Sequence, residues 1–338
     1  MFRQVNRLFA QTCIVRGILQ HSRNEFCSTA LVQLRSKKLL KVSGADASDF
    51  LQGLITNDMG HFNDGAKCMY AMFLNNKGRV LYDSLIYKWD ENSFLLECQR
   101  SVFDSLLRHL SLYKLKRNIL FDDASAGYDV WTLISTVNTP LPEITFDPKS
   151  HINLFADPRL KELGCRLITI NSLDAATLTE LFGKNVILKD EDVYRYARYK
   201  LGVGEGPDEL PPGACFPLEV NCDYLHGVSF HKGCYVGQEL TARIHHTGVV
   251  RKRLMPLRFI EQIGVLENID KEEAIVPARN SKGKIGVLRG FVQDFGIGLL
   301  RIKDAIEAGT VKMSNYTAEV IKPSWWPVEA PKEKINVT

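Results

Sequence analysis

The sequence predicts a globular protein of mixed α and β structure with two or three domains, the last of them a small all-β barrel. Three observations support this fold class. The chain has 338 residues, 45% hydrophobic and 24% charged, which is an ordinary globular composition. Before residue 250, runs with helical spacing of apolar residues alternate with strand-like runs. After residue 250, short runs separated by Gly, Asn and Pro are typical of a β-barrel.

The elements before residue 250 follow from periodicity and from capping residues. Asp46 or Ser48 can cap a helix that carries Phe50, Leu51 and Leu54 on one face. The remaining segments in chain order are expected as a strand at 31–35, three strands within 68–98 with turns at 75–78 and 90–92, a helix within 101–119, a strand at 128–133, a loop at 137–163, a strand at 166–170, a helix that begins at Ser172 and ends at Gly183, a helix at 191–201 ended by Gly202, and a loop at 203–230.

The N-terminal segment is arginine-rich and lacks acids before Glu25. Such an amphipathic leader predicts a mitochondrial transit peptide over residues 1–28, the alternative being a disordered basic tail. Its removal takes away four arginines and one glutamate, so the net charge falls by three, from +4 to +1. The charge of the remaining chain therefore gives no argument for nucleic-acid binding. No apolar run is long enough to span a bilayer, so no membrane partner is expected.

Eight cysteines are scattered singly along the chain, and none forms a C-x-x-C pair. In a reduced mitochondrial matrix, disulfides are not expected, and most of these thiols should be small buried hydrophobic groups. Cys234 differs because it lies in "FHKGCYVGQELTAR", between Lys232-Gly233 and a run that suggests a helix start at Gly237-Gln238. A nearby cation and helical N–H groups favour a thiolate, and glycines permit close backbone approach.

Several chemistries remain open for Cys234. A zinc site could be drawn with nearby histidines, but structural zinc sites usually have paired cysteines. His231 could act as a base in a Cys–His dyad. An iron–sulfur cluster normally takes four ligands, so Cys215 and Cys222 would have to fold close, or a partner protein would have to supply the others. No nucleotide-binding glycine motif is present, since "GVGEG" at 202–206 follows a helix.

The 230–243 segment resembles the K-G-C-[FY]-x-G-Q-E signature of the YgfZ proteins, which belong to the superfamily of the glycine-cleavage aminomethyltransferase (T-protein). In this chain the signature comprises Lys232, Gly233, Cys234, Tyr235, Gly237, Gln238 and Glu239. Further likeness is found in "FLQGLITND" at 50–58, in "FLNNKGRVLYDSLIY" at 73–87, and in the segments around "RYKLGVGEG" and "FPLEVNCDY". The resemblance covers roughly residues 30–330.

This resemblance implies an α+β, three-lobed fold around a central folate-type cavity. It places a discontinuous α+β domain at residues 29–125 and 185–248, a ferredoxin-like domain at 126–184, a C-terminal β-barrel at 249–330 and a tail at 331–338. It also makes Asn57, Asp83, Arg198 and Glu219 candidates for binding tetrahydrofolate. Each of these could instead have a structural role, as a turn residue, a strand or loop carboxylate, or one half of an ion pair.

The resemblance further implies a mitochondrial iron–sulfur cluster assembly factor in the matrix. It would help to mature [4Fe–4S] proteins together with A-type carrier proteins, and Cys234 would be a ligand of a transient shared [2Fe–2S] cluster. Aminomethyltransferases have adjacent acids in the hairpin where this chain has Tyr82-Asp83, so an enzyme is not expected. The alternatives are a folate-dependent one-carbon transferase that uses Asp83 and a folate-sensing scaffold without catalysis. The basic run 251–253 is either a solvated face or a docking patch for an acidic partner.

Overall fold

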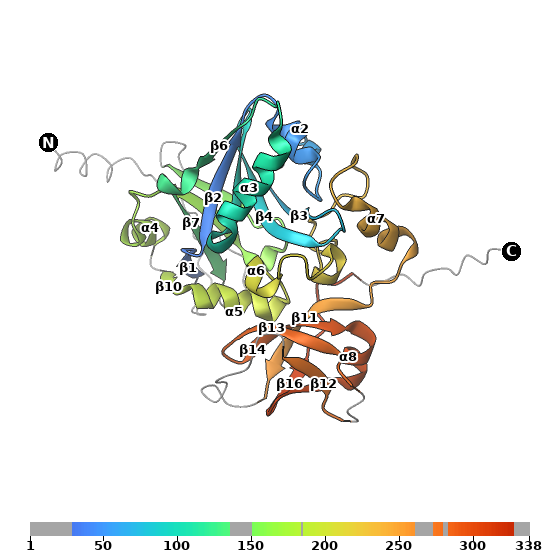
Figure 1. Ribbon diagram of the computed structural model, residues 1–338. Helices are drawn as coiled ribbons and strands as arrows, with labels where there is room; N and C mark the ends of the chain where they lie inside the picture. Colours follow the sequence, from blue (N-terminus) through green and yellow to red (C-terminus); the bar gives the residue numbers. More distant parts are fainter. Residues whose placement is uncertain (1–28, 136–150, 184, 261–272, 280–282, 328–338) are drawn as a thin grey trace.

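The computed structural model describes residues 29–135, 151–183, 185–260, 273–279 and 283–327. Within these residues the strands form two five-stranded sheets and one closed six-stranded barrel (Figure 1). The predicted transit peptide at 1–28 and the tail at 331–338 lie outside the described residues.

The first sheet is antiparallel and has the strand order β3-β4-β5-β2-β6. Its strands are β2 (Lys37–Ser43), β3 (Cys68–Leu74), β4 (Val80–Asp90), β5 (Ser93–Gln99) and β6 (Leu120–Asp123). Helices α2 (Ala47–Gln52) and α3 (Phe103–Lys114) pack their apolar residues on one face of this sheet, with Phe50, Phe73 and Leu106 fully buried between the layers. Asp46 occupies the N-cap position of α2, as one of the two predicted candidates, but its side chain makes no capping hydrogen bond. Its carboxylate instead accepts a hydrogen bond from the Asn118 N–H.

The second sheet has the order β10-β1-β7-β9-β8. Its strands are β1 (Thr29–Gln33), β7 (Tyr128–Ser135), β8 (Ile152–Ala156), β9 (Cys165–Ile170) and β10 (Val186–Lys189), and helix α4 (Ala175–Phe182) covers its outer face. The predicted domain limits assign β1 and β10 to the first lobe, whereas their backbone hydrogen bonds join them to this second sheet. Of the loop predicted at 137–163, residues 137–150 lie outside the described ranges, and the prediction was wrong at 152–156, where β8 forms. Asp174, and not Ser172, caps α4.

The predicted C-terminal barrel is confirmed, with the closed strand order β11-β14-β13-β12-β15-β16. Its elements are β11 (Lys252–Phe259), β12 (Ala274–Pro277), β13 (Gly286–Val292), β14 (Phe295–Arg301), α8 (Ile302–Ala308), β15 (Thr310–Met313) and β16 (Tyr316–Val320). Glycines at 296 and 298 leave room for Phe259 and Leu257 to fill the interior.

Helix α5 (Glu191–Leu201) lies between the two sheets and the barrel, and it contacts β1, β11, β13 and β14 (Figure 1). It ends at Gly202, which takes a left-handed conformation as expected. The segment 203–230 is mostly loop, as predicted, but it includes the short helices α6 (Gly206–Glu209) and η6 (Pro217–Val220). The largest apolar core therefore lies where the two sheets, α5 and the barrel meet.

Candidate functional site

Cys234 is exposed, in the loop that precedes helix α7 (Gln238–Thr247). The thiol-bearing residue lies three positions before Gly237, the N-cap of α7, so it is outside the first turn of that helix. The expected helix start is confirmed, but Cys234 does not itself belong to it. The features of the loop that hold the residue in place come from segments on either side of it.

The Lys232 side chain anchors the loop to the end of α2. Its ammonium group donates hydrogen bonds to the carbonyl oxygens of Gln52, Ile55 and Asn57 at 2.7, 2.8 and 2.6 Å. Burial lowers the pKa of Lys232 to about 8, although the nearby Asp58 carboxylate opposes this shift. A helix C-terminus carries partial negative charge and unpaired carbonyls, so a cation is well placed there. The expected role of Lys232 as a neighbouring charge for the thiol is therefore replaced by a structural one.

The chain before Cys234 is held by the segment that follows α2. The Thr56 hydroxyl donates to the Gly227 carbonyl at 2.6 Å, and the Ser229 N–H donates to the Thr56 carbonyl at 3.0 Å. The Asn57 amide donates to the carbonyls of Tyr70 and His226 at 2.7 and 2.8 Å. Asn57 thus ties strand β3 to the start of the loop. It is buried in these contacts and is not part of the central cavity.

Gly237 fixes the chain after Cys234 against the β3–β4 hairpin. It has φ +79°, and a Cβ there would lie 2.3 Å from the Asn75 carbonyl oxygen. Gly78 in the hairpin makes the reciprocal contact, since its Cβ would lie 2.9 Å from the Gly237 carbonyl oxygen. Both positions need glycine, as predicted for Gly237. Gly233 has no atom within 4 Å of an added Cβ, so the close approach expected there does not occur.

The other motif residues complete this support. The Gln238 side chain accepts a hydrogen bond from the Tyr235 N–H at 3.1 Å, and the Lys232 ammonium lies 4.9 Å from the centre of the Tyr235 ring. Glu239 is exposed in the first turn of α7. The motif therefore places the half-buried residues Lys232, Tyr235, Gly237 and Gln238 around one exposed stretch, Gly233-Cys234.

The other described cysteines lie in the interior. Cys98, Cys215 and Cys222 are buried, and Cys68 and Cys165 are half-buried. Burial raises the pKa of Cys98 and of Cys215 to about 12. Among the described residues no cluster of three or more His, Cys, Asp or Glu side chains could hold a metal ion. His231 is exposed in the same loop, three residues before Cys234, and belongs to no such cluster in the described ranges.

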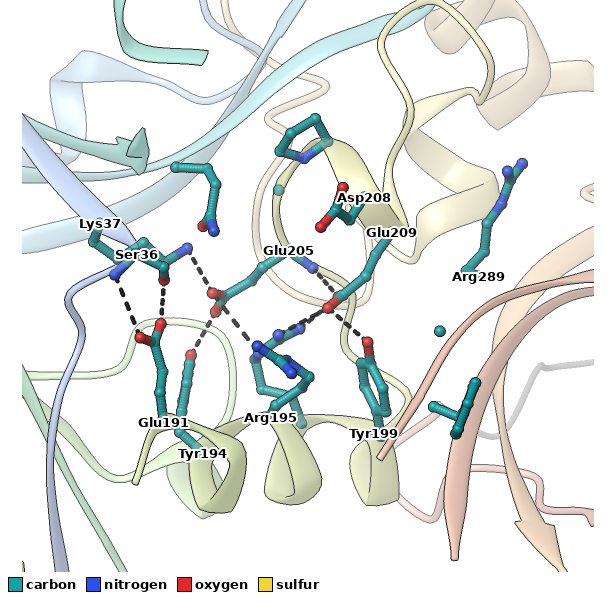
Figure 2. Close-up of a pocket in the computed structure, with 16 residues that line it drawn as sticks. Ser36, Lys37, Glu191, Tyr194, Arg195, Tyr199, Glu205, Asp208, Glu209 and Arg289 are labelled. Carbon is teal, nitrogen blue, oxygen red and sulfur yellow. Dashed lines mark hydrogen bonds and ion pairs between the residues drawn. The ribbon is translucent and has the colours of Figure 1, made fainter. Parts of the chain in front are cut away.

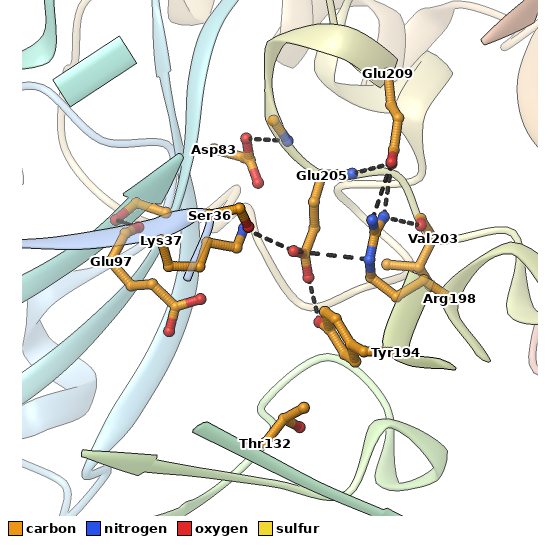
Figure 3. Close-up of polar contacts among 12 residues, drawn as sticks. Ser36, Lys37, Asp83, Glu97, Thr132, Tyr194, Arg198, Val203, Glu205 and Glu209 are labelled. Atoms are coloured by element: carbon orange, nitrogen blue, oxygen red, sulfur yellow. Dashed lines mark hydrogen bonds and ion pairs between the residues drawn. The ribbon is translucent and has the colours of Figure 1, made fainter. Parts of the chain in front are cut away.

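A second concentration of polar groups lies at the centre of the molecule, around Glu205 (Figure 3). The Glu205 carboxylate is 2.7 Å from Lys37, 2.6 Å from Arg159, 3.4 Å from Arg166 and 3.7 Å from Arg198. Burial alone would raise the pKa of this carboxyl, but the four cations hold it well below its usual range. These residues come from β2, the β8–β9 turn, β9 and α5, so the network joins the two sheets to α5.

Arg198 and Asp83 also belong to this network. Arg198 pairs with Glu209 through two hydrogen bonds of 2.6 and 2.9 Å and donates to the Val203 carbonyl (Figure 3). Asp83 accepts the Gly206 N–H at 2.9 Å, and burial raises the pKa of its carboxyl against the opposing charge of Lys37. Thus two of the four predicted folate residues meet near Glu205.

The remaining predicted folate residue, Glu219, caps the short helix η6. Its carboxylate accepts the Phe216 N–H at 3.1 Å. Sequence reasoning missed Lys37, Arg159, Arg166, Glu205 and Glu209, all of them buried charges. One usable signal was present, because Tyr194 and Arg198 are four residues apart on α5 and therefore share a helix face. The arginines of β8–β9 carried no comparable pattern.

The neighbouring Tyr82 faces away from this network. Its ring lies 5.9 Å from that of His109 on α3, while Asp83 points into the centre. Successive residues of a strand alternate between the two faces of a sheet. A carboxylate at position 82 would therefore face α3 and not the central network. The presence of Tyr82, where the aminomethyltransferases have an acid, thus does not change the set of charges at the centre.

The cavity beside the network has a volume of about 220 Å³ (Figure 2). Its walls are largely charged, with Glu191 and Arg195 from α5, Asp208 from α6 and Arg289 from β13. Cavities that bury drug-sized ligands usually measure about 300–1,000 Å³ and are mainly apolar. This cavity is smaller and more polar than such sites.

Comparisons with known proteins agree with this architecture. Residues 12–133 match the family model of the GCVT N-terminal domain, and residues 251–328 match that of the CAF17 C-terminal beta-barrel domain. The glycine cleavage system aminomethyltransferase T from Bartonella henselae has a similar fold, with a TM-score of 0.68 at 15% identity over 88% of this chain and 86% of that chain. The fold is therefore that of the aminomethyltransferases.

Curated relatives decide the family. The mitochondrial iron–sulfur cluster assembly factor IBA57 of Mus musculus is 35% identical over 95% of this chain and 92% of its own length. The human protein of the same name is 34% identical over 88% of this chain and 85% of its own. The chain belongs to the IBA57 family. Its IBA57 relatives are named mitochondrial proteins, so the predicted mitochondrial location is confirmed, while the matrix remains a prediction.

Proposed function

We propose that this IBA57-family chain is an iron–sulfur cluster assembly factor that contributes Cys234 as one ligand to a cluster shared with a second protein. The observation that carries the proposal is that Cys234, alone among the cysteines of the described residues, is exposed, in a loop that Lys232 and Gly237 hold against the rest of the fold. The cluster is cargo, and the other protein is an iron–sulfur protein. We assign that role to an A-type carrier holding a [2Fe–2S] cluster, on the way to [4Fe–4S] clients.

The number of available thiols supports sharing over storage. An iron–sulfur cluster is normally held by four ligands, most of them cysteine thiolates. The other five cysteines in the described ranges are buried or half-buried and lie in other elements. Cys234 can therefore fill one coordination position, and the rest must come from elsewhere. A ligand set divided between two proteins can be taken apart by their dissociation, which suits transfer.

The residues at the centre do not fit tetrahydrofolate. Of the four predicted folate residues, Asn57, Asp83 and Glu219 do not line the cavity. Arg198 does line it, but both of its terminal nitrogens are paired with Glu209. The cavity of about 220 Å³ is also smaller than a site for a molecule of folate size. A folate-dependent transferase is thus not favoured, and no step of the proposal uses folate.

The test is anaerobic mixing of the protein with an A-type carrier loaded with a [2Fe–2S] cluster, read by visible absorption and circular dichroism. Wild type should form a complex with a changed cluster spectrum, because a new thiolate enters the coordination. Cys234→Ser should fold normally and give no such change. Cys165→Ser, which alters a half-buried thiol, should behave like wild type. An unchanged spectral response in Cys234→Ser would show that this sulfur is not a ligand.

A further inference from the structure

A large groove separates the C-terminal half of α7 from the barrel. It has a volume of about 1060 Å³ and is lined by the segment that joins α7 to β11 and by the start of α8. Its apolar lining residues include Ile244, Val249 and Ile302, and Val249 is 72% exposed. Its basic lining residues are Arg251, Lys252, Arg253, Arg301 and Lys303. Figure 1 shows α7 running directly into β11 at this place.

The groove has more basic than acidic side chains, since its five lysines and arginines face only Asp223 and Asp304. Among the described residues, neither Arg251 nor Lys252 forms an ion pair, and both are exposed. The Lys303 ammonium is 3.9 Å from Glu307 in an exposed pair, which neutralises little. Arg253 is different, because it is buried and binds the Asp223 carboxylate through two hydrogen bonds of 2.8 and 2.7 Å. The basic run 251–253 is thus one structural arginine preceded by two free cations.

The groove is physically joined to the Cys234 loop. His245 lines the groove, and its ring stacks on the Phe230 ring with centroids 3.5 Å apart and an angle of 9° between the planes. Phe230 lies four residues before Cys234. Helix α7 has ten residues, which corresponds to a length of about 15 Å. A protein bound at Cys234 could therefore reach the groove by extending along this one helix.

We propose that this groove docks an acidic segment with aliphatic side chains, belonging to the same iron–sulfur protein that shares its cluster with Cys234. The proposal rests on the proposed function and adds the surface that selects the partner. Carboxylates of the segment pair with Arg251 and Lys252, and its aliphatic groups cover Ile244, Val249 and Ile302. Charges at the rim steer encounter and fix register, while the buried apolar contacts slow dissociation.

Such a surface solves a physical problem of cluster sharing. One sulfur–iron contact defines neither the identity nor the orientation of the partner. A second contact about one helix length away restricts the rotation of the partner, so that its cluster faces the loop of Cys234. A nucleic acid is less well suited, because a phosphate chain has no aliphatic groups to cover the apolar side chains of the groove, among them the exposed Val249.

The experiment measures the Kd of the cluster-loaded A-type carrier for wild type and three variants of the full chain, with hydrogen exchange of each complex. The test variant is Arg251→Glu/Lys252→Glu. The control is Lys116→Glu/Lys312→Glu, which reverses two exposed lysines elsewhere and changes the net charge equally. We expect the Kd of the test variant to be about tenfold higher than that of wild type, or more. Its Kd should also change less with salt concentration than the Kd of wild type does. The control should stay within about twofold of wild type. Val249→Asp should act like the test variant.

The outcomes separate this surface from the proposed cluster ligand. At saturating carrier, the test variant should still give the Cys234-dependent spectrum, and residues 244–252 of wild type should be protected from exchange by the carrier. An unchanged Kd in the test variant, with protection confined to 230–237, would refute the groove and leave the shared cluster intact. Protection of the groove without any Cys234-dependent spectrum would support the groove and refute the ligand. Competition by a short RNA better than by an acidic peptide would also overturn the proposal.

Discussion

Replacement of Lys232 by methionine tests whether the loop is built to hold Cys234 in place. The substitution keeps an unbranched side chain of nearly the same length but removes three hydrogen bonds of 2.6–2.8 Å to carbonyl oxygens. A hydrogen bond to a charged group stabilises a fold by roughly 1.5–3 kcal/mol, but three bonds that share one charge are not additive. We therefore expect the free energy of unfolding to fall by about 3 kcal/mol in denaturant titrations at pH 7.

The same variant should also weaken cluster sharing. With its pKa at about 8, Lys232 is mainly protonated at pH 7, so the wild-type contacts are charge-assisted there. Without them, residues 230–236 should exchange amide hydrogens faster, and the Cys234-dependent spectral change should need more carrier. The matched control is Lys77→Met at an exposed lysine of the β3–β4 turn, expected within about 0.5 kcal/mol of wild type. Equal unfolding free energies for the two variants would refute the anchoring role of Lys232.

Two further predictions concern the glycine contact and the central network. Gly237→Ala should destabilise the protein by about 3 kcal/mol in denaturant titrations, because the position has a left-handed φ and the added Cβ would clash with the Asn75 carbonyl oxygen. The control Gly233→Ala should change the stability by less than about 0.5 kcal/mol. Equal effects of the two substitutions would contradict the packing described. Glu205→Gln should cost about 3–5 kcal/mol, and exposed Glu91→Gln almost nothing. The pKa of the Glu205 carboxyl is lowered on folding, so its contribution is present above the ordinary glutamate pKa and is lost as the pH falls below it. The variant should therefore show a flatter loss of stability in acid, and a slope equal to that of wild type would count against the network.

The sequence predicted the local features of the fold better than its long-range pairing. Turn residues and apolar periodicity correctly indicated the β3–β4–β5 strands, α5 with its terminal Gly202 and the barrel. The short strands β8 and β10 were missed. Four to five residues at the edges of the second sheet have little periodicity, and their pairing with β9 and β1 depends on contacts distant in sequence.

The candidate site shows the same limit. Cys234 could be predicted as a site residue because the residues next to it in the sequence form a recognisable motif. The partners of Lys232 were not readable, since its three carbonyls lie about 175–180 residues away and backbone oxygens leave no trace in side-chain patterns. For the same reason the folate candidates could be named but not placed. Arg198 and Glu209 are only eleven residues apart, yet only the fold shows them paired.

The placement of charge argues for a division between the centre and the surface of this scaffold. At the centre, Glu205 is surrounded by four cations, and one of them, Arg198, also pairs with Glu209. These ion pairs hold the two sheets and α5 together, and the cavity beside them is small. At the surface, the segment after α2 holds the loop of Cys234 through Thr56, Asn57 and Lys232. A thiol that must meet an iron atom held by another protein gains from such support, because less conformational entropy is lost on binding when the loop is already fixed. The rigidity of the core thus serves a contact made outside it.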